Sequence, residues 1–309
     1  MSEIASVSIA RPLDEVADEL GRSFREYGFA VIRDHGIPQD LIARAEAMSK
    51  QFFALPEATK KAYKIEGGGG ARGYTPFGVE RAKDAEVHDL KEFWHVGREL
   101  PAGHPLAEYM APNVWPTEVP GFRETFSELY AAFEKAGGRV LEAIALHLGL
   151  GRDYFAPTVE DGNSVMRLLH YPPLDGPHAE GAIRAAAHGD INTITLLLGA
   201  EEAGLELLTA QGEWKAVDTP EGALVVNIGD MLDRLTNNRL KSTQHRVMNP
   251  KGEAAYRSRY SMPFFLHFRP DFDIVTLASC IDPARPDDHP APISSHEFLQ
   301  QRLREINLA

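Results

Sequence analysis

A change in the spacing of apolar residues near Val165 constrains the fold of this chain more than any other feature of its sequence. From there to Phe268 the apolar residues occur in short runs of strand length, and turn residues separate the runs at short intervals. This pattern favours an all-β barrel or a jelly roll. The candidate strands are 165–171, 193–198, 205–208, 214–217, 224–228, 245–248 and 259–268.

The preceding half of the chain has apolar residues at helical spacing. Pro12 and Gly28 bracket one such stretch, with a short apolar strand at 29–32 after it. A second helix begins near Pro38, and Pro56 opens a short polar helix that runs to Tyr63. A long helix is expected over 121–148, although Gly137-Gly138 could interrupt it, and another over 294–306. We therefore expect a helical N-terminal half wrapped on a β core.

Composition limits the classes of function. The 309 residues are 43% hydrophobic and 25% charged, which is typical of a soluble globular chain. The net charge of −13 disfavours a nucleic-acid partner, since a negative surface repels phosphates. No apolar stretch approaches the roughly 18 residues that a membrane span needs. The single Cys280 excludes an internal disulfide and fits a reducing compartment, so we expect a cytoplasmic protein that acts on a small molecule.

The segment His188-Gly189-Asp190 carries the first candidate for chemistry. Residues i and i+2 of an extended strand point to the same face, and Gly189 has no side chain to obstruct the approach. A third histidine would complete a facial triad of two histidines and one carboxylate, which suits Fe(II). The alternative is a loop histidine beside a capping aspartate. A second such pair, His178 and Glu180, ranks below because no strand pattern accompanies it.

Two later strands supply candidate partners for this pair. His245 begins one of them and is the candidate third ligand. Arg259 and Ser261 share a face of the other by the period-2 rule. A guanidinium that points into a barrel needs an anion, and it fits a carboxylate bidentately. A structural ion pair with an acidic residue of the barrel is the alternative interpretation.

These residues form an ordered set of motifs that resembles a known family. The set is Tyr171-Pro172-Pro173, His188-x-Asp190, Asn227-Ile228-Gly229-Asp230, Lys241-Ser242-x-x-His245-Arg246-Val247 and Arg259-Tyr260-Ser261. The segments Tyr27-Gly28-Phe29, Asp34-His35-Gly36-Ile37 and Phe52-Phe53-x-Leu55-Pro56 extend the likeness to the N-terminal half. The chain resembles the isopenicillin N synthase-like branch of the Fe(II)/2-oxoglutarate-dependent dioxygenases over nearly its whole length.

The resemblance implies a double-stranded β-helix (jelly-roll) core, mainly β with flanking helices. It implies Fe(II) on His188, Asp190 and His245. It further implies that Arg259 and Ser261 hold the distal carboxylate of 2-oxoglutarate, with Tyr171 as a further contact. Leu169 stands where plant members often have asparagine, and His170 follows it.

The implied reaction uses O₂ and 2-oxoglutarate to oxidise a small molecule, most simply by hydroxylation, with release of succinate and CO₂. Two alternatives stay open. One is a 2-oxoglutarate-independent oxidase, as in isopenicillin N synthase itself, where a matching Arg-x-Ser grips the substrate. The other is a non-catalytic metal-binding barrel.

Four aromatic residues are candidates for the substrate pocket. Phe265 and Phe264 lie near the end of the Arg259 strand, and family analogy favours Phe265, although either could be core. Tyr74 and Phe77 lie in a glycine-rich loop, 67–78, that could cover the pocket, with surface exposure as the alternative for Tyr74. Four regions are expected within one compact unit: an N-terminal region (1–120), a scaffold helix (121–160), the iron-binding core (161–270) and a C-terminal extension (271–309).

Overall fold

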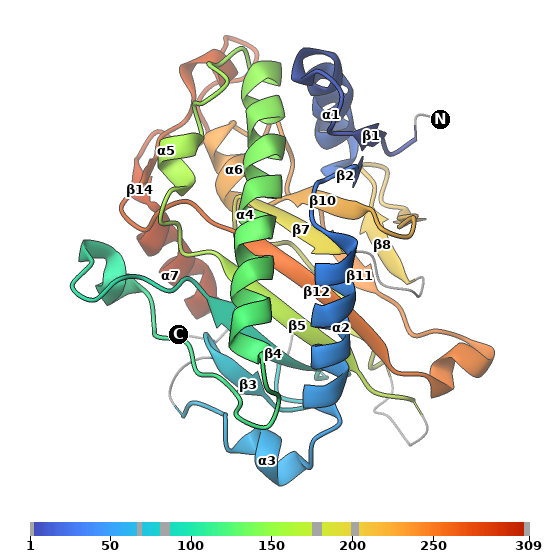
Figure 1. Cartoon of the computed structure of the whole chain (residues 1–309). Coiled ribbons are helices and arrows are strands. Elements are labelled where there is room, and N and C mark those ends of the chain that lie inside the picture. The colour runs from blue at the N-terminus through green and yellow to red at the C-terminus, as the bar shows by residue number, and fades with distance from the viewer. Residues whose placement is uncertain (1–2, 67–69, 81–86, 175–180, 199–203, 306–309) are drawn as a thin grey trace.

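The computed structural model describes residues 3–66, 70–80, 87–174, 181–198 and 204–305. Within these ranges a large and a small antiparallel sheet pack against each other, and helices cover the outer face of the large sheet (Figure 1). The sole parallel pair among the described strands joins β1 to β2. The large sheet has the order β1 (Ser6–Ser8), β2 (Phe29–Arg33), β10 (Leu224–Ile228), β7 (Ile194–Leu198), β12 (Arg259–Leu266), β5 (Val165–Tyr171), β4 (Glu92–Gly97) and β3 (Gly73–Thr75).

The small sheet lies over the opposite face of the large one. Its order is β6 (Ala185–His188), β11 (His245–Val247), β8 (Leu205–Leu208) and β9 (Trp214–Ala216), and a separate pair joins β13 (Asp273–Ile274) to β14 (Ile293–Ser294). The described α-helices are α1 (Leu13–Tyr27), α2 (Gln39–Phe53), α3 (Glu57–Lys61), α4 (Phe122–His147), α5 (Ala156–Val159), α6 (Asp230–Leu235) and α7 (Ser295–Glu305). None of the described helices is long and apolar enough to cross a membrane. The expected jelly-roll core with flanking helices is confirmed.

Alternation along the strands gives the large sheet two different faces. The even-numbered residues of β12, such as Phe264, belong to the main core beneath α1, α2 and α4. The Phe264 ring stacks on Phe133 of α4, with 5.1 Å between centroids and an interplanar angle of 6°. The odd-numbered residues, including Arg259 and Ser261, therefore point into the space between the two sheets.

The helix predictions are confirmed with two corrections. Helix α1 ends at Gly28, whose φ of 69° gives the left-handed cap that glycine favours. Helix α4 runs without interruption through Gly137-Gly138, contrary to the possible break. A Cβ at Gly137 would lie 2.4 Å from Leu266 Cδ1, so glycine there lets α4 approach β12 closely. Helix α3 ends two residues before Tyr63.

All seven expected strands are present, with ends that differ by at most two residues from those expected. The sequence patterns did not indicate β4. Its charged, aromatic and imidazole side chains do not give the alternation of apolar and polar residues that marks a strand. Glu92 of β4 is 3% exposed and accepts hydrogen bonds from Lys60 Nζ at 2.9 and 2.8 Å. A buried ion pair thus stands where an alternating pattern would have an apolar residue.

Candidate active site

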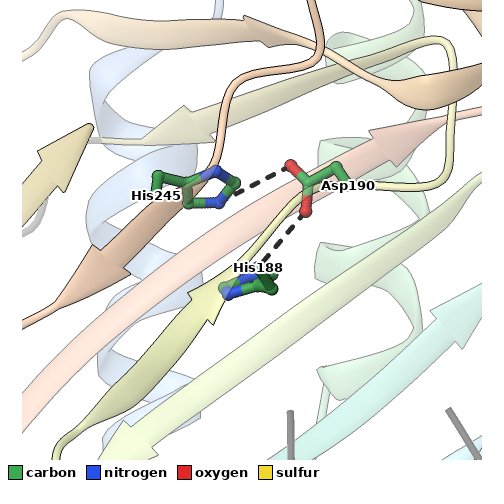
Figure 2. A group of neighbouring side chains, drawn as sticks. All are labelled: His188, Asp190 and His245. Atoms are coloured by element: carbon green, nitrogen blue, oxygen red, sulfur yellow. Dashed lines mark ion pairs between the residues drawn. The ribbon is translucent and has the colours of Figure 1, made fainter. Parts of the chain in front are cut away.

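Three side chains converge between the two sheets (Figure 2). His188 Nε2 lies 3.9 Å from Asp190 Oδ1, and His245 Nε2 lies 3.9 Å from Asp190 Oδ2. One potential ligand atom from each residue lies within 4.8 Å of the others. The imidazole rings of the two histidines have centroids 4.5 Å apart. Asp190 and His245 are buried, whereas the His188 side chain is 36% exposed, so one side of the cluster is open.

Strand register brings the histidines together. Strand β11 pairs antiparallel with β6, and His245 stands directly opposite His188. The sequence expectation that a late strand returns beside the His188 segment is met by this pairing.

A tight turn between β10 and α6 fixes the main chain around Asp190. The N–H of Asp230 donates to the carbonyl of Asp190 at 2.8 Å, and the N–H of Gly229 donates to the carbonyl of Thr193 at 3.0 Å. A Cβ at Gly229 would lie 2.0 Å from the Asn192 carbonyl oxygen. Glycine is therefore required for the two loops to meet this closely.

Two neighbours hold the Asp190 carboxylate. The Thr195 hydroxyl donates to Oδ2 at 2.5 Å, and Asn227 Nδ2 donates to the same oxygen at 2.7 Å. A carboxylate oxygen has two lone-pair directions, so these bonds occupy Oδ2 and leave Oδ1 available. Burial opposes ionisation of Asp190, but the two histidines in their protonated form, together with these two donors, hold its pKa below the ordinary value.

The tautomers of both histidines follow from their second nitrogen. His188 Nδ1 lies 2.7 Å from the Ala186 carbonyl oxygen, and His245 Nδ1 lies 3.2 Å from the Thr243 carbonyl oxygen. A carbonyl can only accept, so each Nδ1 carries the proton and each Nε2 presents a lone pair toward Asp190. Partial burial of the ring, with His245 beside it, lowers the pKa of His188. At neutral pH the cluster offers a neutral imidazole and an ionised carboxylate, as a divalent transition metal requires.

A second group of polar residues lies farther along the same interior face. Arg259 of β12 stands opposite Tyr171 of β5, and Ser261 stands opposite Leu169. Arg259, Ser261 and Tyr171 are all less than 7% exposed. The Arg259 guanidinium carbon lies 5.1 Å from the centroid of the Tyr171 ring. The structure thus brings these three expected co-substrate residues into one place.

The four expected pocket residues separate. Phe265 is odd-numbered on β12, partly exposed, and paired with Thr195, so it lies on the interior face near Asp190. Phe264 belongs to the core beneath α4, which corrects the expectation that it lines the pocket. Tyr74 is also not a pocket residue, because its ring packs on Phe52 of α2 and its hydroxyl donates to Glu92. Phe77 is 46% exposed.

Some residues around the site were not assigned from the sequence. Thr195 and Asn227 each interrupt an apolar strand with a buried polar group, and that signal could have identified them as partners of Asp190. Arg184 is fully buried with its guanidinium carbon 5.7 Å from the Tyr171 ring centroid. No strand pattern surrounds Arg184 in the sequence, so nothing there pointed to it. The weaker candidates His178 and Glu180 lie outside the described residues.

Comparisons with known proteins agree with this geometry. The family model of the 2OG-Fe(II) oxygenase superfamily matches residues 162–268, and that of the N-terminal region of non-haem dioxygenases in morphine synthesis matches 4–118. A 2-oxoglutarate-Fe(II) type oxidoreductase of Emericella nidulans is 36% identical over 302 residues, covering 94% of this chain and 84% of the relative.

Solved structures extend the likeness. A crystal structure of a 2OG-Fe(II) oxygenase family protein from Caulobacter crescentus is 56% identical, with a TM-score of 0.91 over 99% of this chain and 100% of that one. A full-length Neurospora crassa protein, solved in complex with α-KG, is 28% identical, with a TM-score of 0.86 over 97% of this chain and 95% of that one. Fold, motif order and relatives agree along the whole length, and the chain belongs to the 2-oxoglutarate-Fe(II) oxygenase superfamily as a non-haem iron, 2-oxoglutarate-dependent dioxygenase.

Proposed function

We propose that His188, Asp190 and His245 bind Fe(II), and that Arg259, Ser261 and Tyr171 bind 2-oxoglutarate beside it. The enzyme then oxidises a small molecule, most simply by hydroxylation, with release of succinate and CO₂. The observation that carries the metal assignment is the pair of Nδ1 bonds to backbone carbonyls, because these leave both Nε2 atoms as ligands on the Asp190 side. The partner strands that hold them in register support it.

The donor set fits Fe(II) better than a structural zinc ion. Asp190 Oδ1 remains available after Oδ2 has received two hydrogen bonds, which gives one carboxylate and two imidazole ligands. Three ligands on one side leave coordination positions for co-substrate and O₂, whereas structural zinc sites are closed by four protein ligands. Bound iron, with 2-oxoglutarate and O₂, supplies the oxidising power of the reaction.

The protein's own residues bind and orient the reactants. Arg259 can hold a carboxylate with two parallel hydrogen bonds, and the Ser261 hydroxyl on the same face can donate a third. The Tyr171 ring packs beside the guanidinium and restricts its position. Phe265, paired with Thr195, presents an apolar side chain beside Asp190 on which a substrate can pack.

The setting of the reaction follows from composition. The net charge of −13 disfavours nucleic acid as a partner, and the lone cysteine, Cys280, is buried and unpaired. We infer a cytoplasmic enzyme of a small-molecule substrate.

An anaerobic titration tests this function. 2-Oxoglutarate is added to the Fe(II)-loaded protein under nitrogen while the visible metal-to-ligand charge-transfer band is followed, and succinate is measured after O₂ is admitted. We expect a saturable band and O₂-dependent succinate. O₂ consumption without a band would favour the 2-oxoglutarate-independent oxidase, and the absence of both would favour a non-catalytic metal-binding barrel.

A further inference from the structure

Arg72, which precedes β3, is a buried cation with no counter-charge among the residues that the structure describes. The residue is only 4% exposed, and its Nη1 donates to the Ala71 carbonyl at 2.7 Å. Its Nε and Nη2 are buried and have no hydrogen-bond partner in the same described ranges. Burial lowers the pKa of Arg72, as expected for a charge removed from water without compensation. Such a group is costly unless something binds it.

A neighbouring arginine shows what a structural guanidinium looks like in this fold. Arg167 of β5 also lies on the interior face, and it makes two parallel bonds to Glu80, of 3.1 and 3.0 Å. Glu80 in turn lies 2.6 Å from Lys91 Nζ. The charge of Arg167 is therefore neutralised by a carboxylate of the protein, whereas Arg72 has no such partner among the described residues.

Strand register places Arg72 relative to Asp190. Residues Asn227, Thr195, Phe265, Val165 and Gly97 stand directly opposite one another on five successive strands. Directly paired residues present their side chains on the same face. Asn227 and Thr195 bind the Asp190 carboxylate, so the interior face carries Asp190 at one end of this row.

Gly97 stands at the other end of the row and makes room for Arg72. A Cβ at Gly97 would lie 1.9 Å from the Arg72 guanidinium carbon, so the guanidinium rests against the bare backbone on the interior face. The three strand spacings from Thr195 to Gly97 amount to roughly 14 Å. Phe265 and Val165, both partly exposed, fill the row between them.

The described titratable groups beside Arg72 do not neutralise it. Burial lowers the pKa values of His95 and His267. The positive charges of Arg167 and then Arg72 lower the pKa of His95 further, and the charge of Arg72 also lowers that of His267. The pKa of His267 falls to about 4, so this ring is uncharged at neutral pH. These imidazoles bring no negative charge to Arg72, and both nitrogens of His95 are already engaged, one by Arg167 Nε at 2.6 Å and the other by the Gly70 carbonyl oxygen. The end of the row that carries Gly97 thus holds Arg72 without a carboxylate partner among the described residues. The nearby Arg167, whose guanidinium carbon lies 5.4 Å from the Phe265 ring centroid, is by contrast neutralised by Glu80.

We propose that Arg72 is the receptor for an oxyanion on the prime substrate, which lies across Phe265 and Val165 with its reacting carbon toward the triad. This inference rests on the proposed function, since it assigns a substrate class to that site. A carboxylate and a phosphate monoester share the chemistry that Arg72 recognises. Recognition at this distance from the triad gives orientation as well as affinity, because the anion fixes which part of the substrate reaches the metal.

A bromide soak tests the receptor without knowledge of the substrate. Crystals grown with Mn(II) and 2-oxoglutarate, which occupies the Arg259 region, are soaked in sodium bromide, and anomalous scattering locates bound ions. We expect bromide at the Arg72 Nε and Nη2 atoms, and none at that place in Arg72→Met. A wild-type crystal with no bromide there, or a variant crystal that retains it, would overturn the proposal. Failure of 2-oxoglutarate to appear in the crystal would count against the proposed function instead.

Matched compounds test the substrate class. Small carboxylic acids, their primary amides and the corresponding phosphate monoesters are compared for stimulation of succinate release. We expect the acids or the phosphates to stimulate and the amides not to, and the preferred anion to identify the source. Arg72→Met should raise the apparent KM of the stimulating compounds about tenfold or more, and Arg72→Lys should be intermediate. The 2-oxoglutarate charge-transfer band should not change in either variant.

Two controls separate binding from folding. Arg123→Met removes an exposed arginine paired with Glu99 and should leave the KM unchanged. Arg72→Met should unfold at the same temperature as the wild type or higher, because removal of an uncompensated buried charge does not weaken the fold. Equal stimulation by acids and amides, or an unaltered KM in Arg72→Met, would refute the assignment even if succinate is still formed. A marked loss of stability in Arg72→Met would make Arg72 a structural residue.

Discussion

Replacement of Thr195 by valine removes one of the two side-chain hydrogen bonds to the proposed metal-binding carboxylate. Valine keeps the β-branched shape of threonine in a buried position of β7 and removes only the hydroxyl. The strongest bond lost is the 2.5 Å contact to Asp190 Oδ2, and Asn227 Nδ2 remains on the same oxygen at 2.7 Å. The hydroxyl also accepts a weaker bond from Asn192 Nδ2 at 3.2 Å, but that amide keeps its 2.7 Å bond to the Ile194 carbonyl. Asp190 then becomes a less well-oriented and more easily protonated ligand.

The size of the effect follows from the charge of the acceptor. A hydrogen bond to a charged group contributes about 1.5–3 kcal/mol, and loss of a partner that orients a metal ligand typically costs about 10–100-fold in affinity. We therefore expect Fe(II) and Mn(II) to bind Thr195→Val at least about tenfold more weakly. Loss of this donor also raises the pKa of Asp190, so metal affinity should begin to fall at a higher pH when the solution is acidified. Anaerobic isothermal titration at several pH values measures both.

Thr193 supplies a matched control two residues away. It is fully buried, and its hydroxyl has no hydrogen-bond partner among the described residues. Thr193→Val makes the same chemical change but removes no bond to Asp190, so its metal affinity should equal that of the wild type. Equal affinities in the two variants would refute the argument that Thr195 supports the metal site through its hydroxyl.

Three further predictions concern the triad, the co-substrate residues and a buried acid. His245→Ala should lose iron binding and turnover while its circular dichroism spectrum stays native; full iron affinity would show that the triad assignment is wrong. Arg259→Ala should weaken 2-oxoglutarate binding by about a hundredfold or more in the charge-transfer titration, since truncating one side of a buried charge pair costs about 3–5 kcal/mol, whereas the exposed Arg257→Ala should not. Burial raises the pKa of Asp233 to about 6 from 3.8, so the folded state holds this proton more tightly than the unfolded chain and stability falls as pH rises between these values. Asp233→Asn keeps an acceptor for the Ser242 N–H and should raise stability at pH 7 by on the order of 2 kcal/mol but not at pH 4, measured by urea unfolding; an equal gain at both pH values would contradict the assignment.

The β core was predictable because its strands combine local and long-range signals. Period-2 alternation places Arg259 and Ser261 on one face whatever lies around them, and the structure has both on the interior. The triad was predictable for the same reason, since His188 and Asp190 are two residues apart and His245 begins a strand. The division of the chain at 120, 160 and 270 stays a prediction.

Residues whose role depends on contacts distant in sequence could not be found this way. Arg72 resembles any loop arginine in the sequence, and its lack of a partner among the described residues becomes visible only when Gly97 and the neighbouring strands are in place. Strand β4 was missed because the charge of Glu92 is neutralised by Lys60 of α3, a residue distant in the sequence. Phe264 and Phe265 are adjacent and chemically identical. Their positions differ only because one face of β12 packs against α4, which places Phe264 in the core and Phe265 in the interior.

The alternation of core-facing and interior-facing residues along β12 also explains why the site residues keep their positions. The interior residues Ser261 and Phe265 have neighbours on the opposite face of β12 that are almost fully buried: Met262 is 4% exposed, Phe264 is not exposed and Leu266 is 2% exposed. A slip of one residue would turn these three side chains into the interior and place Arg259 and Ser261 against the apolar core. Burial of two such polar groups without partners, together with exposure of three large apolar side chains, costs several kcal/mol, a large share of the stability of an ordinary domain. The apolar face of the strand thus fixes the position of the polar face, and the packing of α4 determines where the site residues point.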